Sequence, residues 1–204
     1  KFKVNDKKKF QVYCKDFDNN GSYDVVLSTN YKDYDVPTRG RECSSQQMPF
    51  IAEEFQDYHS FASASLQDIY GEGLNNALNI QIDVLHSAYL ENDGSGNFNW
   101  IQLPAASQMA PLQDFEFVDL DGDGQLEVLT VGDLYNVEVE TERYDASIGA
   151  VLKKTDTGFE YWDKQETGFI GMGDARKVIK VSGSSGDQII LSNNNGPIEV
   201  FQLQ

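Results

Sequence analysis

Two nine-residue stretches, DFDNNGSYD from Asp16 to Asp24 and DLDGDGQLE from Asp119 to Glu127, share one pattern. In each, an acidic or amide side chain occupies positions 1, 3, 5 and 9, and glycine occupies position 6. Alternate side chains of a tight loop can converge on one point, and glycine permits the sharp reversal. Hard cations such as calcium take about six to eight oxygen ligands at about 2.3–2.6 Å. The repeated pattern therefore predicts two calcium sites.

The residues after each loop distinguish these sites from EF-hands. An EF-hand loop ends in a bidentate acid at position 12, inside a helix, whereas position 12 is Leu27 in the first loop and Thr130 in the second. The last acid stands at position 9 instead, and apolar, β-branched runs typical of buried strands follow it. We therefore expect each loop to join two strands.

The predicted ligands are the side chains at positions 1, 3, 5 and 9 and the backbone carbonyl at position 7. They are Asp16, Asp18, Asn20, Ser22 and Asp24 in the first loop, and Asp119, Asp121, Asp123, Gln125 and Glu127 in the second. The alternative is that Asp, Asn and Gly only form polar β-turns. That alternative suits the second loop less, because its clustered carboxylates would repel one another without a cation. The first loop has one charge fewer at position 5, so we expect it to bind calcium more weakly.

The chain is strongly acidic. Its 204 residues include 16 Lys plus Arg and 33 Asp plus Glu, which gives a formal charge of −17. This charge argues against nucleic acids and anionic membrane surfaces as partners. No apolar run approaches the ~20 residues of a membrane-spanning helix. The chain shows no signal peptide and begins with Lys1 instead of Met, which we interpret as a processed or cut chain.

The rest of the sequence suggests three repeated β units, residues 1–108, 109–174 and 175–204. Residues 88–103 and 149–162 each combine two strand-like runs with a Gly-containing turn, which predicts a hairpin in each of the first two units. In the third unit a Ser-Gly-rich stretch replaces the acidic loop, so we expect no ion there. Between about residues 37 and 85 the apolar spacing becomes helical, which predicts one or two inserted helices.

Two groups of side chains carry weaker signals. Cys14 and Cys43 could form a disulfide in an oxidising compartment, or Cys14 could be a buried strand residue. A dense polar group comprises Glu138, Glu140, Arg143, Tyr144 and Asp145. We interpret it as an ion-pair network, in which the two glutamates share one face of a strand and Arg143 could neutralise them, with a ligand pocket as the less favoured alternative.

Catalytic motifs are not evident in the sequence. Cys43 and His59 lack a third orienting residue. The patterns typical of serine hydrolases, zinc proteases, P-loop enzymes and dinucleotide-binding folds do not occur. We therefore expect a protein that is not an enzyme.

The acidic loops, the strands behind them and the N-D-G-x-G-x-F hairpin resemble FG-GAP/VCBS repeats, the blade units of integrin-α-like β-propellers. Segments 41–50, 138–145, 147–149, 167–169 and 194–196 resemble bacterial VCBS-repeat proteins of the cartilage-acidic-protein-like type. The resemblance covers nearly the whole chain. It implies an all-β fold of about three four-stranded antiparallel blades, here with a small helical insertion, and calcium between neighbouring strands of a blade. Closed propellers have roughly four to eight blades, so we expect a segment of a larger propeller or one completed by another chain, including a second copy of this one.

The expected function is that of a calcium-stabilised binding or adhesion module, because this family's known roles are mostly in binding. We expect it outside the cytoplasm (secreted, periplasmic or at the cell surface), where calcium is plentiful, with a protein or glycan as ligand. The alternative is an accessory or catalytic part of a polysaccharide-processing enzyme. Its sugar platform would consist of Tyr31, Tyr34, Trp100, Tyr135 and Trp162, although strand aromatics more often fill cores.

Overall fold

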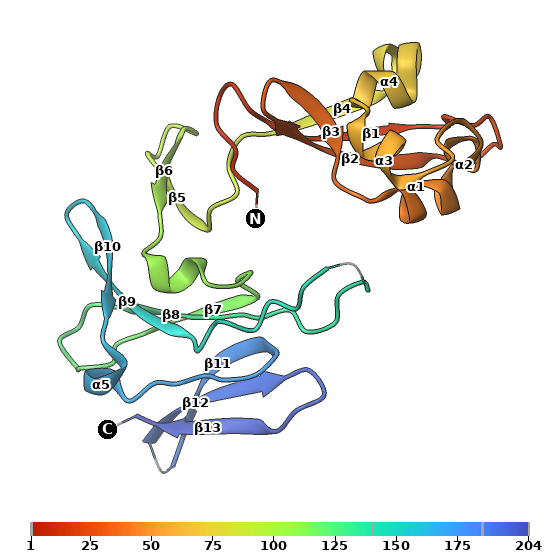
Figure 1. Cartoon of the computed structure of the whole chain (residues 1–204). Coiled ribbons are helices and arrows are strands. Elements are labelled where there is room, and N and C mark those ends of the chain that lie inside the picture. Colours follow the sequence, from red (N-terminus) through yellow and green to blue (C-terminus); the bar gives the residue numbers. More distant parts are fainter. Residues whose placement is uncertain (1, 140, 185, 204) are drawn as a thin grey trace. The chain divides into compact units, whose positions relative to one another are not determined.

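The computed structural model describes residues 2–139, 141–184 and 186–203 and is mostly β, with 40% strand and 18% helix (Figure 1). The chain divides into two compact units, Lys1–Leu85 and His86–Gln204. The boundary falls inside the segment 1–108 that was expected to form the first unit. Within the described residues the sheets are antiparallel, and none closes into a barrel or a propeller.

The first unit contains one four-stranded sheet in the order β3-β2-β1-β4. In β2 the side chains of Asp24, Val26 and Ser28 are buried, and they alternate with more exposed residues. One face of the sheet is therefore buried, since successive side chains of a strand point to opposite faces. The strands are β1 (Phe10–Lys15), β2 (Asp24–Tyr31), β3 (Tyr34–Pro37) and β4 (Leu78–Ile82).

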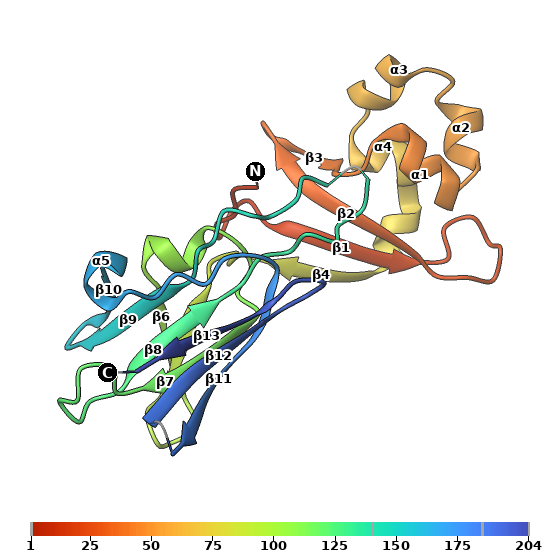
Figure 2. The ribbon, with the colours of Figure 1, turned by 90° about the horizontal axis from the view of Figure 1, so that it is seen from below.

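Short helices lie beside this sheet (Figure 2), and they supply the apolar partners of its buried face. Val26 of β2 belongs to one core cluster with helical residues such as Ile51 and Ile69. The helices are α1 (Arg41–Gln47), α2 (Phe50–Glu54), α3 (Tyr58–Ser63), α4 (Leu66–Tyr70) and the 3₁₀-helix η1 (Gly71–Asn76). One or two helices were expected. The segment is divided more finely because Asp57 caps α3 and a capping box between Ser65 and Asp68 begins α4.

The second unit contains a four-stranded sheet in the order β10-β9-β8-β7, a three-stranded sheet in the order β11-β12-β13, and the two-stranded pair β5-β6. Its strands are β5 (Ala88–Asn92), β6 (Phe98–Gln102), β7 (Asp114–Val118), β8 (Glu127–Val131), β9 (Ala150–Thr155), β10 (Gly158–Trp162), β11 (Ala175–Gly183), β12 (Gly186–Asn193) and β13 (Ile198–Gln202). Its helices are η2 (Ala105–Gln108) and α5 (Lys164–Thr167).

Both predicted hairpins are present, as β5-β6 and β9-β10. The first of them forms a sheet of its own in the second unit and does not extend the β1–β4 sheet. The segment that was expected to be a partial third unit forms β11–β13. The strand expected around Glu138 is not formed. Residues 135–139 have no β-pairing with another segment.

The core of the second unit joins its two larger sheets. Leu129 of β8, Val151 of β9, Val178 of β11 and Leu191 of β12 are each at most 2% exposed and belong to one cluster. The carboxylate of Asp114 on β7 reinforces this packing by accepting hydrogen bonds from Val178 N at 2.9 Å and Lys177 Nζ at 3.0 Å. The acidic loop between β7 and β8 is therefore anchored at one end of a packed core. No helix within the described residues is long and apolar enough to cross a membrane.

Candidate metal centres

Each predicted loop joins two adjacent, antiparallel strands. The first connects β1 to β2 and the second connects β7 to β8. Both loops have left-handed backbone at positions 4 and 6. At position 4 the φ angle is 58° for Asn19 and 76° for Gly122, and at position 6 it is 90° for Gly21 and 87° for Gly124. Gly and Asn adopt this conformation at little energetic cost, so the sequence fits the loop shape at both positions.

The same hydrogen bonds fix both loops. The position 1 carboxylate accepts from the backbone N–H of position 6, and the position 9 carboxylate accepts from that of position 2. The distances are 2.9 Å for Gly21 to Asp16, 3.0 Å for Gly124 to Asp119, 2.9 Å for Phe17 to Asp24 and 2.9 Å for Leu120 to Glu127. The first and last acids of each loop are therefore drawn to its centre.

Three carboxylates meet in each loop. One oxygen from each of Asp16, Asp18 and Asp24 lies within 4.8 Å of the other two, and the same holds for Asp119, Asp121 and Glu127. The side-chain oxygens at position 5 accept hydrogen bonds from the backbone N–H of position 7. Asn20 Oδ1 accepts from Ser22 N at 2.8 Å, and Asp123 Oδ1 accepts from Gln125 N at 2.7 Å. The structure therefore brings together six of the eight predicted side-chain ligands, and Asp123 lies outside the second group.

The position 9 acid is the buried member of each group. Asp24 is 2% exposed and Glu127 is 3% exposed, and each is the first residue of its strand. Burial of a carboxylate is unfavourable unless it is hydrogen-bonded or compensated by opposite charge. Either group would hold a cation against the start of a core strand.

Oxygen is the only donor type in these groups, since neither contains His or Cys. Clustered carboxylates suit hard divalent cations. The donor sets therefore fit the predicted metal, and they are unsuited to a soft one.

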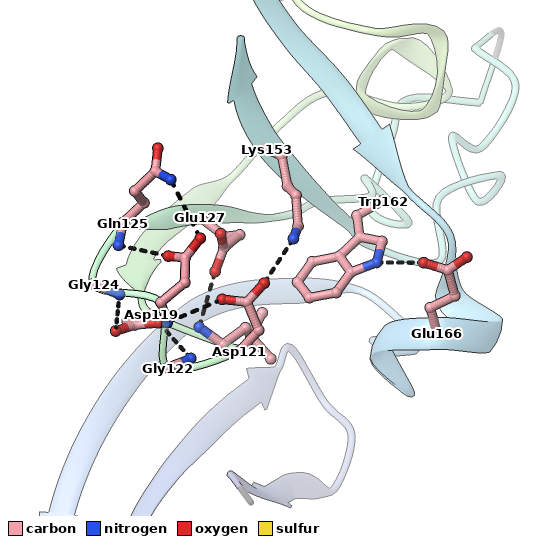
Figure 3. A network of polar contacts seen from close by, with 11 residues as sticks. Asp119, Asp121, Gly122, Gly124, Gln125, Glu127, Lys153, Trp162 and Glu166 are labelled. Carbon is pink, nitrogen blue, oxygen red and sulfur yellow. Dashed lines mark hydrogen bonds and ion pairs between the residues drawn. The ribbon is translucent and has the colours of Figure 1, made fainter.

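A lysine from the neighbouring strand lies against the second loop (Figure 3). Lys153 Nζ on β9 donates to Asp121 Oδ2 at 2.7 Å and lies 3.5 Å from the centroid of the Trp162 ring. On the other side of the indole, Trp162 Nε1 donates to Glu166 Oε2 at 2.6 Å. The hydrogen bond from Lys153 lowers the pKa of Asp121, and the same bond raises the pKa of Lys153.

Lys153 was not among the predicted site residues. It is 32 residues from Asp121 in the sequence, so the loop pattern gives no indication of it. No local pattern on β9 reveals it, because the contact depends on the register in which β9 pairs with β8 and β10.

A second polar cluster lies in the segment after β8. Asp133 is 1% exposed, and its Oδ1 accepts from Ser147 N at 3.1 Å, while its Oδ2 has no hydrogen-bond partner among the described residues. Burial raises the pKa of Asp133, and the charges of Asp145 and Asp174 raise it further. Burial also acts to raise the pKa of Asp174, but hydrogen bonds, with Asn194 first, leave it lowered overall.

Within the dense polar group, Arg143 is paired with Asp145. Its guanidinium binds Asp145 Oδ2 at 2.9 and 2.7 Å and lies 4.3 Å from the ring centroid of Tyr135. Glu138 accepts a hydrogen bond from Thr141 Oγ1 at 3.2 Å, and Glu140 lies outside the described residues. The ion pair that Arg143 forms with Asp145 is therefore local, between residues two positions apart.

The five aromatic residues considered as a sugar platform are divided between the units. Tyr31 and Tyr34 belong to the first unit, with ring centroids 6.0 Å apart. Trp100, Tyr135 and Trp162 belong to the second unit. Protein cations already lie over the rings of Tyr135 and Trp162, so one face of each is occupied.

Comparisons of the chain with protein-family models, with curated protein sequences and with solved structures found no match. The resemblance to FG-GAP/VCBS repeats remains a prediction, and the loops are the main guide to function.

Proposed function

We propose that this chain is a calcium-binding module in which two calcium ions are structural, one in each acidic loop. One observation carries the proposal: two loops in separate units share left-handed backbone at positions 4 and 6, hydrogen bonds from the backbone to the first and last acids, and a trio of converging carboxylates. In a polar turn that serves only to reverse the chain, Asp and Asn side chains hydrogen-bond nearby backbone groups and have no need to converge on one point. Three acids that converge in both loops are explained by a cation.

Calcium suits these donors better than the other common metals. The loops offer carboxylates, an amide oxygen and backbone carbonyls, which are hard ligands. Their spacing relies on flexible side chains, and calcium tolerates irregular geometry where magnesium demands a near-ideal octahedron. Asn20, Asp123 and the carbonyls of Ser22 and Gln125 would complete the ligand sets after small rotations.

The position of the buried acid makes the proposed role structural. Asp24 and Glu127 begin strands that run into the two cores, so an ion held by them would link loop to sheet. Bound calcium would offset the repulsion among the carboxylates, and binding energy would then add to folding stability.

A structural calcium site of this kind suits an environment rich in calcium, so we place the protein outside the cytoplasm. The resemblance to FG-GAP/VCBS repeats supports an adhesion or binding role, with blades of a propeller as the architecture. A protein or glycan would be the ligand.

Isothermal titration calorimetry with calcium on the whole chain tests the proposal. We expect two calcium ions per chain and weaker binding of magnesium. Asp16→Asn and Asp119→Asn should each remove one site, because each variant takes the acid at position 1 from one loop. Asp156→Asn, an exposed change of the same charge in the β9-β10 turn, is the matched control and should retain both sites. The absence of calcium binding by the wild-type chain at millimolar concentrations would refute the proposal.

A further inference from the structure

The second loop differs from the first by having a cation of the protein itself on one carboxylate. Lys153 Nζ forms an ion pair with Asp121 Oδ2 at 2.7 Å, and the side chains of the pair are 30% and 32% exposed. In the first loop the equivalent acid, Asp18, accepts from the neutral amide of Asn20 at 3.0 Å. Within the described residues no lysine or arginine forms an ion pair with the carboxylates of the first loop. The ammonium comes from β9, outside the acidic cluster, and it occupies one oxygen of a predicted ligand of the second loop.

The register of the sheet places the ammonium there. Leu152 pairs with Val128, the residue after Glu127. Lys153 therefore lies at the end of the β8-β9 pair that adjoins the loop. Trp162 pairs with Val151, and it is therefore the diagonal neighbour of Lys153 on the same face of the sheet. The side chain of Lys153 crosses the indole to reach Asp121, and its position is thus determined by both contacts (Figure 3).

We infer that Lys153 is a built-in competitor for the cation of the second loop, and that Trp162 reports which of the two is bound. The inference rests on the proposed function, because it assumes that the loops bind calcium. Asp121 is needed as a ligand, and Lys153 occupies its Oδ2 while Asp123 N donates to its Oδ1 at 3.3 Å. An ammonium and a divalent ion on one carboxylate repel each other. Calcium therefore binds the second loop in exchange for Lys153, and Lys153 lowers the calcium affinity of that loop alone.

The exchange has a consequence for Trp162. Its ring lies between the ammonium of Lys153 and the carboxylate of Glu166. When Lys153 leaves Asp121, the positive charge over the indole moves while Glu166 stays on the ring nitrogen. The emission of Trp162 should therefore change as the second loop fills. The side chain of Trp162 also lines a cavity of about 450 Å³ with Leu120 of the loop. Movement of Lys153 away from Asp121 would therefore change the charge next to the wall of that cavity.

The test uses three variants of the full chain. The chain has two tryptophans, and Trp100 is 44% exposed, so Trp100→Phe leaves Trp162 as the only indole without opening a core. In this background, Lys153→Met removes the charge and keeps an apolar stem on the ring. Lys153→Arg keeps the charge. Lys154→Met is the matched control, since Lys154 is the next residue along β9 and pairs with Glu91 at 3.2 Å.

Calcium binding is followed by calorimetry and by Trp162 emission. We expect Lys153→Met to tighten one calcium site about tenfold, equivalent to about 1.4 kcal/mol, and to reduce the calcium-dependent change in emission. Lys153→Arg and Lys154→Met should keep the wild-type affinities at both sites. The inference fails if Lys153→Met binds both ions with wild-type affinity, or if the emission of the Trp100→Phe chain is unchanged while both loops fill. If the wild-type chain binds no calcium, the proposed function and this inference fail together. Calorimetry of the wild type identifies this case, because in the other two cases the wild type still binds calcium.

Discussion

Replacement of Glu127 by Gln should separate the role of the buried acid in folding from its role in binding. Glu127 is 3% exposed, and its Oε2 accepts a hydrogen bond from Leu120 N at 2.9 Å. The amide oxygen of Gln can accept the same bond. The new amide N–H groups would lie near Asp119 and Asp121, whose carboxylates can accept from them. The substitution therefore removes one negative charge from a crowded group and leaves its hydrogen bonding intact.

The expected effect has opposite signs with and without calcium. Without calcium, less repulsion among the carboxylates should make the variant at least as stable as the wild type. With calcium at about 100 times the wild-type Kd, binding stabilises the wild type by about 2.7 kcal/mol. Loss of a residue that only supports a ligand weakens a metal site about 10–100-fold, so we take the upper value for Glu127, a predicted ligand. The variant then gains only about 0.4 kcal/mol at the same calcium concentration. The difference of about 2.3 kcal/mol corresponds to about 5–9 °C in melting temperature for a chain of this size.

Scanning calorimetry of both proteins, in excess calcium and in excess chelator, measures their melting temperatures with and without calcium. Asp156→Asn, an exposed change of the same charge in the β9-β10 turn, is the control and should melt as the wild type does in both conditions. The reasoning is wrong if Glu127→Gln shows the full calcium-dependent increase. It is also wrong if the variant is much less stable than the wild type in chelator, since Glu127 would then stabilise the fold without a cation.

Two further predictions concern the segment behind the second loop. Gly132→Ala should destabilise the second unit by several kcal/mol, on the order of the largest single-residue effects, because the added Cβ would lie 2.1 Å from the backbone oxygen of Pro111; a urea midpoint within error of the wild type would contradict this. Asp133→Asn should stabilise the protein at pH 7. Burial and the charges of Asp145 and Asp174 raise the pKa of Asp133, so the unfolded chain loses this proton first as pH rises, and wild-type stability falls through that range. Asn does not titrate, and urea unfolding from pH 4 to pH 8 should show a flatter pH dependence in the variant; equal slopes in the two proteins would rule the explanation out.

The features that the sequence predicts well are local ones. Each acidic loop is defined within nine residues, because the left-handed positions of Asn19, Gly21, Gly122 and Gly124 and the hydrogen bonds of the acids all fall inside it. The β9-β10 hairpin is equally local, with its turn between Thr155 and Gly158. Short-range geometry of this kind depends on residue type at fixed spacing, which a single sequence displays.

Contacts between distant segments were not predicted, because they depend on strand register. Lys153 reaches Asp121 only because Leu152 pairs with Val128. The partnership of Tyr135 and Asp174 spans 39 residues and follows from the packing of β8 against β11. The β5-β6 hairpin was correctly recognised as a hairpin, yet its own residues do not indicate which sheet it would join. Apolar alternation shows that a face is buried but does not identify the strand that lies beside it.

The asymmetry between the loops bears on how the two units would respond to calcium. The second loop has the additional acid, Asp123, which favours tighter binding of calcium. Lys153 opposes this effect, because it forms an ion pair with Asp121 of the same loop. The first loop has fewer charges, and its carboxylates have no ion-paired competitor among the described residues. The two effects oppose each other, so charge count alone does not rank the affinities, and Lys153 would bring the two sites closer together. If both loops then fill over a similar range of calcium concentration, the sheets of both units gain stability together. That behaviour suits a structural ion, whereas a sensor benefits from sites that fill at well-separated concentrations.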